Sequence, residues 1–172
     1  NLNLTAGRSV VCVDRKGDGE YGIYVANYGG PTRFYEIENE LIKDKAKNLN
    51  LDNITGGRAV VSGHILTERA DIFAANERGA NFLFKNNNGK FDDVAFDYRL
   101  DDAIQNGRGT ALSDIYYRGR LDILSGNWLG YHRAWVLKNN EFKDIGNKDF
   151  DEPSRIRTII SADFDNDGFD EV

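Results

Sequence analysis

Hydrophobic residues in this chain occur in short runs that are separated by clusters of Gly, Asn and Asp. The runs are rich in Val, Ile, Phe, Tyr and Leu, as in GIYVAN at 22–27, DIFAAN at 71–76 and DILSGN at 122–127. Short β-branched and aromatic runs between turn residues are typical of antiparallel strands. A helical array would instead show a period of 3.6 residues. The pattern therefore predicts an all-β protein, with 39–48 as a local stretch that could form a helical turn.

A Gly-Arg pair marks the start of a repeat. It occurs at Gly7-Arg8, Gly57-Arg58 and Gly107-Arg108, a spacing of 50 residues each time, and Arg157 follows 49 residues after Arg108. Each repeat contains four β-rich runs in the same order. Four strands in about 50 residues is the size of one β-propeller blade.

The repeat predicts part of a β-propeller built from four-stranded antiparallel blades. The expected blades span approximately 7–56, 57–106 and 107–155, and a fourth begins at 156–172. Because propellers usually close with four to eight blades, we expect the protein to continue into further blades of the same chain.

A calcium site is predicted near the end of the sequence, in DFDNDGFDE at 163–171. Ca²⁺ takes several oxygen ligands in a compact shell, which carboxylates on alternate residues of a turning loop can supply. The expected ligands are the side chains of Asp163, Asp165, Asp167 and Glu171 and the main-chain carbonyl of Phe169. The alternatives are an EF-hand loop, which needs flanking helices and a Glu at position twelve, and an acidic turn without metal. The β-branched run before the loop favours a β-hairpin.

The three earlier copies of this loop are degraded. The first keeps Asp14 and Asp18 but has Lys16 between them, and it is a weaker calcium candidate. The third has Arg118 at position five. In both loops a side-chain cation could take the place of calcium by charge-assisted hydrogen bonds. The second copy, at 64–71, has lost the pattern and one residue.

Composition excludes several classes of function. Lys and Arg total 22 and Asp and Glu total 28, so the net charge is −6, and a nucleic-acid partner would need a basic stripe instead. No apolar run approaches the roughly 20 residues that span a bilayer. The single cysteine, Cys12, lies in an apolar strand pattern, which predicts a buried free thiol.

No motif for catalysis is present: the sequence lacks G-x-S-x-G, H-E-x-x-H and a phosphate-binding glycine loop, so an enzyme is not expected. The arginines of the Gly-Arg pairs are predicted to be structural, pairing with carboxylates or carbonyls between blades. A ring of arginines that binds a ligand is the alternative.

These motifs resemble the FG-GAP repeat, also called the VCBS repeat, and most closely its form in the cartilage acidic protein family, which contains an ASPIC/UnbV domain. The resemblance is carried by FDDVA at 91–95, Gly107-Arg108-Gly109, GRSVVCVDRKGDGEYGIYVANY at 7–28 and SADFDNDGFDEV at 161–172. It covers essentially the whole chain. It implies a secreted, extracellular, calcium-binding propeller glycoprotein.

Two Asn-x-Thr sequons, at Asn3 and Asn53, fit secretion and are expected glycosylation sites. The predicted function is an extracellular interaction scaffold, stiffened by calcium, whose loops meet a protein or matrix partner of unknown identity. The alternative is the propeller domain of a secreted carbohydrate-active enzyme, a lyase or hydrolase, with structural calcium.

Overall fold

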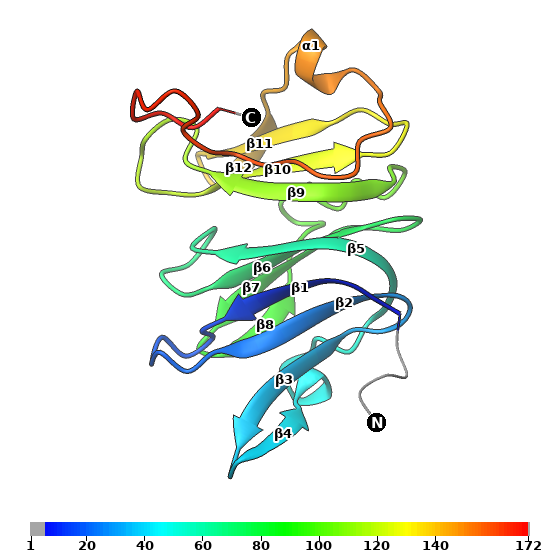
Figure 1. Cartoon of the computed structure of the whole chain (residues 1–172), viewed down its shortest axis with the longest axis vertical. Helices are drawn as coiled ribbons and strands as arrows, with labels where there is room; N and C mark the ends of the chain where they lie inside the picture. Colours follow the sequence, from blue (N-terminus) through cyan, green and yellow to red (C-terminus); the bar gives the residue numbers. More distant parts are fainter. Residues whose placement is uncertain (1–5, 172) are drawn as a thin grey trace.

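The computed structural model describes residues 6–171, and antiparallel β-strands dominate it. Successive strands pair with one another in three four-stranded groups, each a simple meander (Figure 1). All the strand pairs are antiparallel. The predicted all-β class and antiparallel pairing are thus confirmed.

The first unit comprises β1 (Gly7–Val13), β2 (Gly22–Pro31), β3 (Arg33–Glu38) and β4 (Leu41–Asp44). A short 3-10 helix, η1 (Ala46–Leu49), follows β4 and lies at the end of the stretch where a helical turn was expected.

The second unit comprises β5 (Ile54–Gly63), β6 (Asp71–Asn76), β7 (Phe82–Asn87) and β8 (Lys90–Asp93). Every residue of β6 is buried. A strand that is covered on both faces reads as a continuous apolar run, as DIFAAN does, rather than as an alternating one.

The third unit comprises β9 (Gly107–Ser113), β10 (Asp122–Asn127), β11 (Arg133–Lys138) and β12 (Glu141–Asp144). After the short helix α1 (Lys148–Asp151) the chain returns along the open face of this unit (Figure 1). Within the described part of this C-terminal segment, pairing is limited to isolated bridges, including one between Ala162 and Glu171.

The units stack one above another, and a hydrophobic core fills each space between them (Figure 1). The core between the first and second units includes Tyr24, Phe34, Ile72, Phe84 and Phe91. The core between the second and third includes Phe73, Leu83, Ile123, Trp135 and Phe142. A smaller core joins the third unit to the C-terminal segment through Ala111, Leu124, Ala134 and Ile159.

The first two units do not form separate sheets, which differs from the expected arrangement of independent blades. β2 runs on past Asn27, and its last residues pair with the start of β5, at Tyr28 with Gly56 and at Pro31 with Ile54. The two units therefore make one curled eight-stranded sheet, and the third makes a four-stranded sheet. The described residues show this curled arrangement and not a closed propeller.

The units share one polarity. The Gly-Arg end of β1, β5 and β9 lies on the right of Figure 1, and the loops that follow these strands lie together on the left, beside the loop of the C-terminal segment. The repeat therefore brings the four acidic loops to one edge of the molecule. Within the described residues, no helix is long and apolar enough to cross a membrane.

The prediction that Cys12 is buried is wrong, because its side chain is exposed. Side chains alternate between the two faces of a strand. Val11 and Val13 face the core of the first two units, so Cys12 lies on the opposite face of β1, which no described element covers.

Candidate metal centre

Three of the four loops share one backbone conformation. Counting the first Asp of each as position one, positions four and six have positive φ in the first, third and fourth loops, at Gly17 and Gly19, Tyr117 and Gly119, and Asn166 and Gly168. The loops therefore turn in the same way although their side chains differ.

The aspartate at position one stabilises this turn by accepting main-chain hydrogen bonds. In the fourth loop, Asp163 accepts hydrogen bonds from the main-chain N–H of Asp167 (3.1 Å) and of Gly168 (2.9 Å). Asp14 and Asp114 accept the equivalent bonds in the first and third loops. Such bonds from main-chain N–H groups lower the pKa of Asp14, with the Gly19 N–H as the largest cause.

The fourth loop gathers three carboxylates. Asp163, Asp165 and Glu171 each present an oxygen within 4.8 Å of the other two, Asp163 half-buried and the others exposed. Asp165 and Glu171 are positioned by the N–H groups of Asp167 (3.1 Å) and Phe164 (2.8 Å). The bridge between Ala162 and Glu171 closes the loop as a β-hairpin. The described residues before the loop, 152–162, form no helix, which favours the hairpin over the EF-hand alternative.

Asp167 is not part of this group. Its carboxylate accepts a hydrogen bond from the N–H of Phe169 (2.9 Å), within its own turn. The structure thus brings together three of the four predicted carboxylates. The predicted ligand role of Asp167 and of the Phe169 carbonyl stays a prediction.

The donor set fits Ca²⁺. All three side chains offer hard carboxylate oxygens, and calcium–oxygen bonds are about 2.3–2.6 Å long. Oxygens that share one ion are therefore at most about 5 Å apart, and the oxygens of this group lie within 4.8 Å of one another. Solvent exposure leaves room for water or a main-chain carbonyl to complete the shell.

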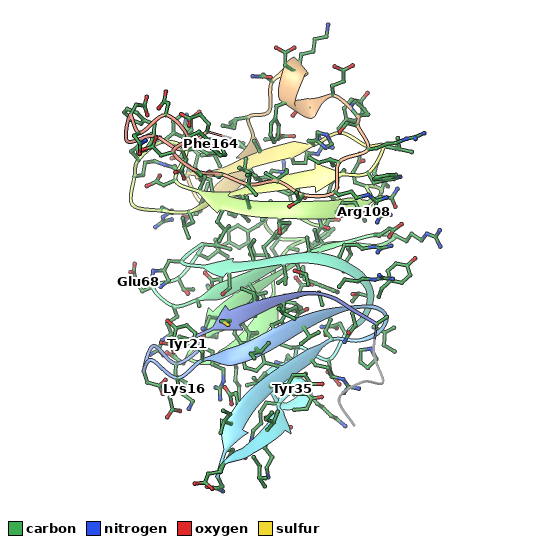
Figure 2. The ribbon with its side chains drawn as sticks, in the orientation of Figure 1. Lys16, Tyr21, Tyr35, Glu68, Arg108 and Phe164 are labelled. Atoms are coloured by element: carbon green, nitrogen blue, oxygen red, sulfur yellow. The ribbon has the colours of Figure 1, made fainter. Side chains whose placement is uncertain are left out.

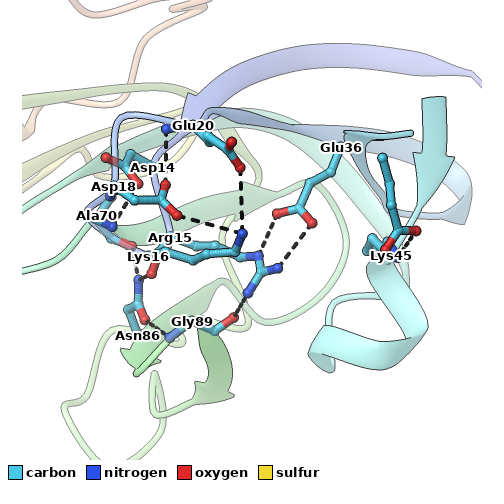
Figure 3. A network of polar contacts seen from close by, with 12 residues as sticks. Asp14, Arg15, Lys16, Asp18, Glu20, Glu36, Lys45, Ala70, Asn86 and Gly89 are labelled. Atoms are coloured by element: carbon cyan, nitrogen blue, oxygen red, sulfur yellow. Dashed lines mark hydrogen bonds and ion pairs between the residues drawn. The ribbon is translucent and has the colours of Figure 1, made fainter. Parts of the chain in front are cut away.

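The first loop is fixed by cations of the protein itself (Figure 3). Lys16 lies 3.7 Å from both Asp18 and Glu20. Arg15 pairs with Glu36 and donates to the carbonyl of Gly89 in the second unit (2.9 Å). Asp14 and Asp18, the weaker calcium candidates, are therefore held in a loop that is already tied to its neighbour.

In the third loop, Arg118 neutralises a buried carboxylate. Its guanidinium contacts Asp122 (2.6 Å) and donates to the carbonyl of Leu137 (2.8 Å). Asp122 is fully buried. Burial raises the pKa of Asp122, and Arg118 acts in the opposite direction.

In the second loop, the partners of the buried carboxylate are neutral groups. Asp71 is equivalent to Asp122 and is also fully buried. Its carboxylate accepts hydrogen bonds from Leu66 N–H (2.7 Å), Thr67 N–H (2.9 Å) and Asn86 N–H (2.8 Å). The second loop, which is one residue shorter than the others, therefore forms a compact turn around the Asp71 carboxylate alone.

The Gly-Arg arginines, called here the arginine column, lie at the end of the strands opposite the acidic loops, as Arg108 does in Figure 2. Arg8 and Arg58 lie on Tyr28, 5.7 and 4.4 Å from the ring centre, and Arg108 and Arg157 lie on Trp128, 5.1 and 4.6 Å from the ring centroid. Between them, Glu77 pairs with Arg58 and, at 3.0 Å, with Arg108. The prediction of structural arginines is confirmed for Arg58 and Arg108, which link the second and third units through a carboxylate.

Of the two sequons, Asn3 lies outside the described residues. Asn53 lies immediately before β5 and is half-buried. Its main-chain groups are bonded to Thr32. Glycosylation at either position stays a prediction.

A family model described as an FG-GAP-like repeat matches residues 114–172. The chain is 45% identical to cartilage acidic protein 1 of Homo sapiens, 44% to that of Mus musculus and 43% to that of Xenopus tropicalis, in each case over 96% of this chain. It spans 28% of the length of these relatives. The predicted resemblance is confirmed.

Proposed function

We propose, from the premise that this chain is homologous to cartilage acidic protein 1 and carries an FG-GAP-like repeat, that it forms part of an extracellular calcium-binding β-propeller. The propeller would serve as an interaction scaffold in a secreted matrix or cell-surface glycoprotein. The name of the relatives contains no enzymatic activity, and no observation on the described residues favours the alternative of a carbohydrate-active enzyme.

The stacking of the units supports the propeller. Each of the described four-stranded meanders packs on the next through an apolar face, and β1, β5 and β9 run in the same direction (Figure 1). A stack of this kind closes when further units follow, which removes the exposed faces at its two ends. Secretion and glycosylation at Asn3 and Asn53 belong to the same proposal.

The calcium claim is carried by the group of Asp163, Asp165 and Glu171, whose oxygens lie within 4.8 Å of one another. Three carboxylates at this distance repel one another unless a cation lies among them. Calcium that binds only the folded protein would stabilise it by about 2.7 kcal/mol when its free concentration is 100 times the dissociation constant.

Calorimetry on the full-length protein tests this proposal with Asp165→Ala. We expect the substitution to abolish one strong calcium-binding event and the matching rise in melting temperature. Asp18→Ala in the first loop is the control and should change the calcium heat little, because Lys16 already supplies a positive charge there. If Asp165→Ala leaves both measurements unchanged, the fourth loop is an acidic turn without metal.

A further inference from the structure

Tyr117 has a backbone conformation that its residue type disfavours. It lies at position four of the third loop with φ of 53°. The first and fourth loops have Gly17 and Asn166 at this position, and these residue types tolerate positive φ. A bulky residue there is strained, and such strain persists only where surrounding contacts offset it.

The offsetting contacts come from the fourth loop. The Tyr117 hydroxyl accepts a hydrogen bond from the main-chain N–H of Asp170 (3.0 Å). Its ring meets the ring of Phe169 edge-on, with the centroids 4.4 Å apart. This is a favourable geometry for an aromatic pair.

A second connection fixes the same residue. Ser113, the buried last residue of β9, donates its hydroxyl to the carboxylate of Asp170 (3.0 Å), and Ser161 does so at 3.2 Å. The carboxylate of Asp170 is thus directed to serines and away from the acidic group. The third unit therefore holds the segment 169–170, which directly precedes Glu171.

We propose that Tyr117 is a positioning residue for calcium in the neighbouring loop. By holding Phe169 and Asp170, it sets the approach of Glu171 to Asp163 and Asp165, so that the ion meets a preorganised group. Preorganisation raises affinity because less conformational freedom is lost on binding. This inference rests on the calcium binding proposed above.

The third loop lacks acidic side chains at two of the positions that carry them in the fourth loop. The third loop has lost its own metal ligands at positions three and five, where Tyr116 and Arg118 stand. It has kept the turn, which now presents Tyr117 to the loop beside it. The third loop is thus a support for the calcium site and not a second calcium site.

The test is calcium titration of the full-length protein, following the binding event that Asp165→Ala removes. Tyr117→Phe keeps the ring and loses the hydroxyl, and should weaken this event about threefold to tenfold, the equivalent of one hydrogen bond. Tyr116→Phe is the matched control and should leave it unchanged, because Tyr116 contacts Arg118 and not the fourth loop.

Tyr117→Gly separates positioning from a purely local role. Glycine suits the left-handed backbone, as Gly17 does in the first loop, so a local role predicts unchanged or tighter calcium binding. We expect binding to weaken about tenfold or more, because both the ring and the hydroxyl are lost.

Unchanged affinity in Tyr117→Phe and Tyr117→Gly, with Asp165→Ala still abolishing the event, would overturn the role of Tyr117 and leave the calcium site intact. No effect of Asp165→Ala would overturn the calcium site and this inference together.

Discussion

The carboxylate of Asp122 is fully buried, and Arg118 supplies the opposing charge beside it. The equivalent Asp71 is balanced by N–H groups, and the equivalent Glu171 is exposed in the acidic group. At position five the third loop has Arg118 where the fourth has Asp167, and at position three it has Tyr116 where the fourth has Asp165. The third and fourth loops thus share one turn but differ in the groups that balance their carboxylates.

Replacing Arg118 by Ala should destabilise the protein by about 2 kcal/mol at pH 7, because a buried carboxylate loses its partner. We expect less than for a fully buried pair, since the Arg118 side chain is 34% exposed. The measurement is urea denaturation of the full-length protein. Arg120→Ala, in the same loop, is the control and should cost little.

The cost of Arg118→Ala should shrink as the pH falls. Burial raises the pKa of Asp122 in the folded protein above its unfolded value, and loss of Arg118 raises it further. Above its folded pKa, such a carboxyl is charged in both the folded and the unfolded protein, and its destabilising effect is complete. At low pH it is protonated in both states, and the effect disappears. Denaturation at pH 7 and pH 4 checks this, and a cost that is equal at both values would contradict it.

At the scale of the elements, the arginine column lies at the starts of β1, β5 and β9, and Arg58 and Arg108 link the second and third units through Glu77. Tyr28 and Trp128 hold their arginines by their ring faces, whereas Glu77 holds Arg58 and Arg108 by charge. Tyr28, Glu77 and Trp128 occupy the same position in the repeat. This position thus contacts the arginines either through an aromatic ring or through a carboxylate.

This equivalence predicts that an aromatic residue can replace Glu77. Glu77→Ala should lower the free energy of unfolding by about 3 kcal/mol, because two largely buried arginines lose their shared carboxylate. Glu77→Trp should recover at least half of that loss by cation–π contact. Thermal unfolding of the full-length protein measures both. A tryptophan variant no more stable than the alanine variant would show that charge is required there.

The strands and the acidic group could be predicted because they depend on local patterns. DIFAAN and DILSGN are buried along their whole length. The spacing of Asp163, Asp165 and Glu171 in one short loop is enough to bring their carboxylates together. The pairing of β2 with β5 could not be predicted, because the pattern does not show how far a strand continues past Asn27. Tyr117 was missed for another reason, since its contact with Asp170 joins loops 53 residues apart. The sequence held one signal for this role: Tyr117 is a bulky residue at a position where two other loops have Gly or Asn.

At the scale of the whole molecule, one face of the first unit differs from the same face of the second. Equivalent positions are apolar in both, but they are exposed in the first and buried in the second. The pairs are Val10 and Val60 (63% and 7% exposed), Ile23 and Ile72 (44% and 0%), and Ile42 and Phe91 (60% and 0%). In the second unit this face packs on the first. By continuity, the proposed propeller places another blade on the exposed face.

Cys12 reports whether such a blade is present, because it lies on this exposed face. Its equivalent in the third unit, Leu112, packs into the core against the second unit. A blade packed on the first unit would cover the Cys12 thiol in the same way. In the native full-length protein we therefore expect Cys12 to react with an alkylating reagent at least tenfold more slowly than in the unfolded protein, as measured by mass spectrometry of the peptide that contains it. Addition of a chelator should raise the alkylation rate only if loss of calcium separates this blade from the first unit.

Ile23→Asp, which places a charge in the expected interface, should restore fast labelling of Cys12, since an unpaired buried charge is costly. Fast labelling of the native, unmodified sequence would mean that no blade covers the first unit, and the closed propeller would then be wrong.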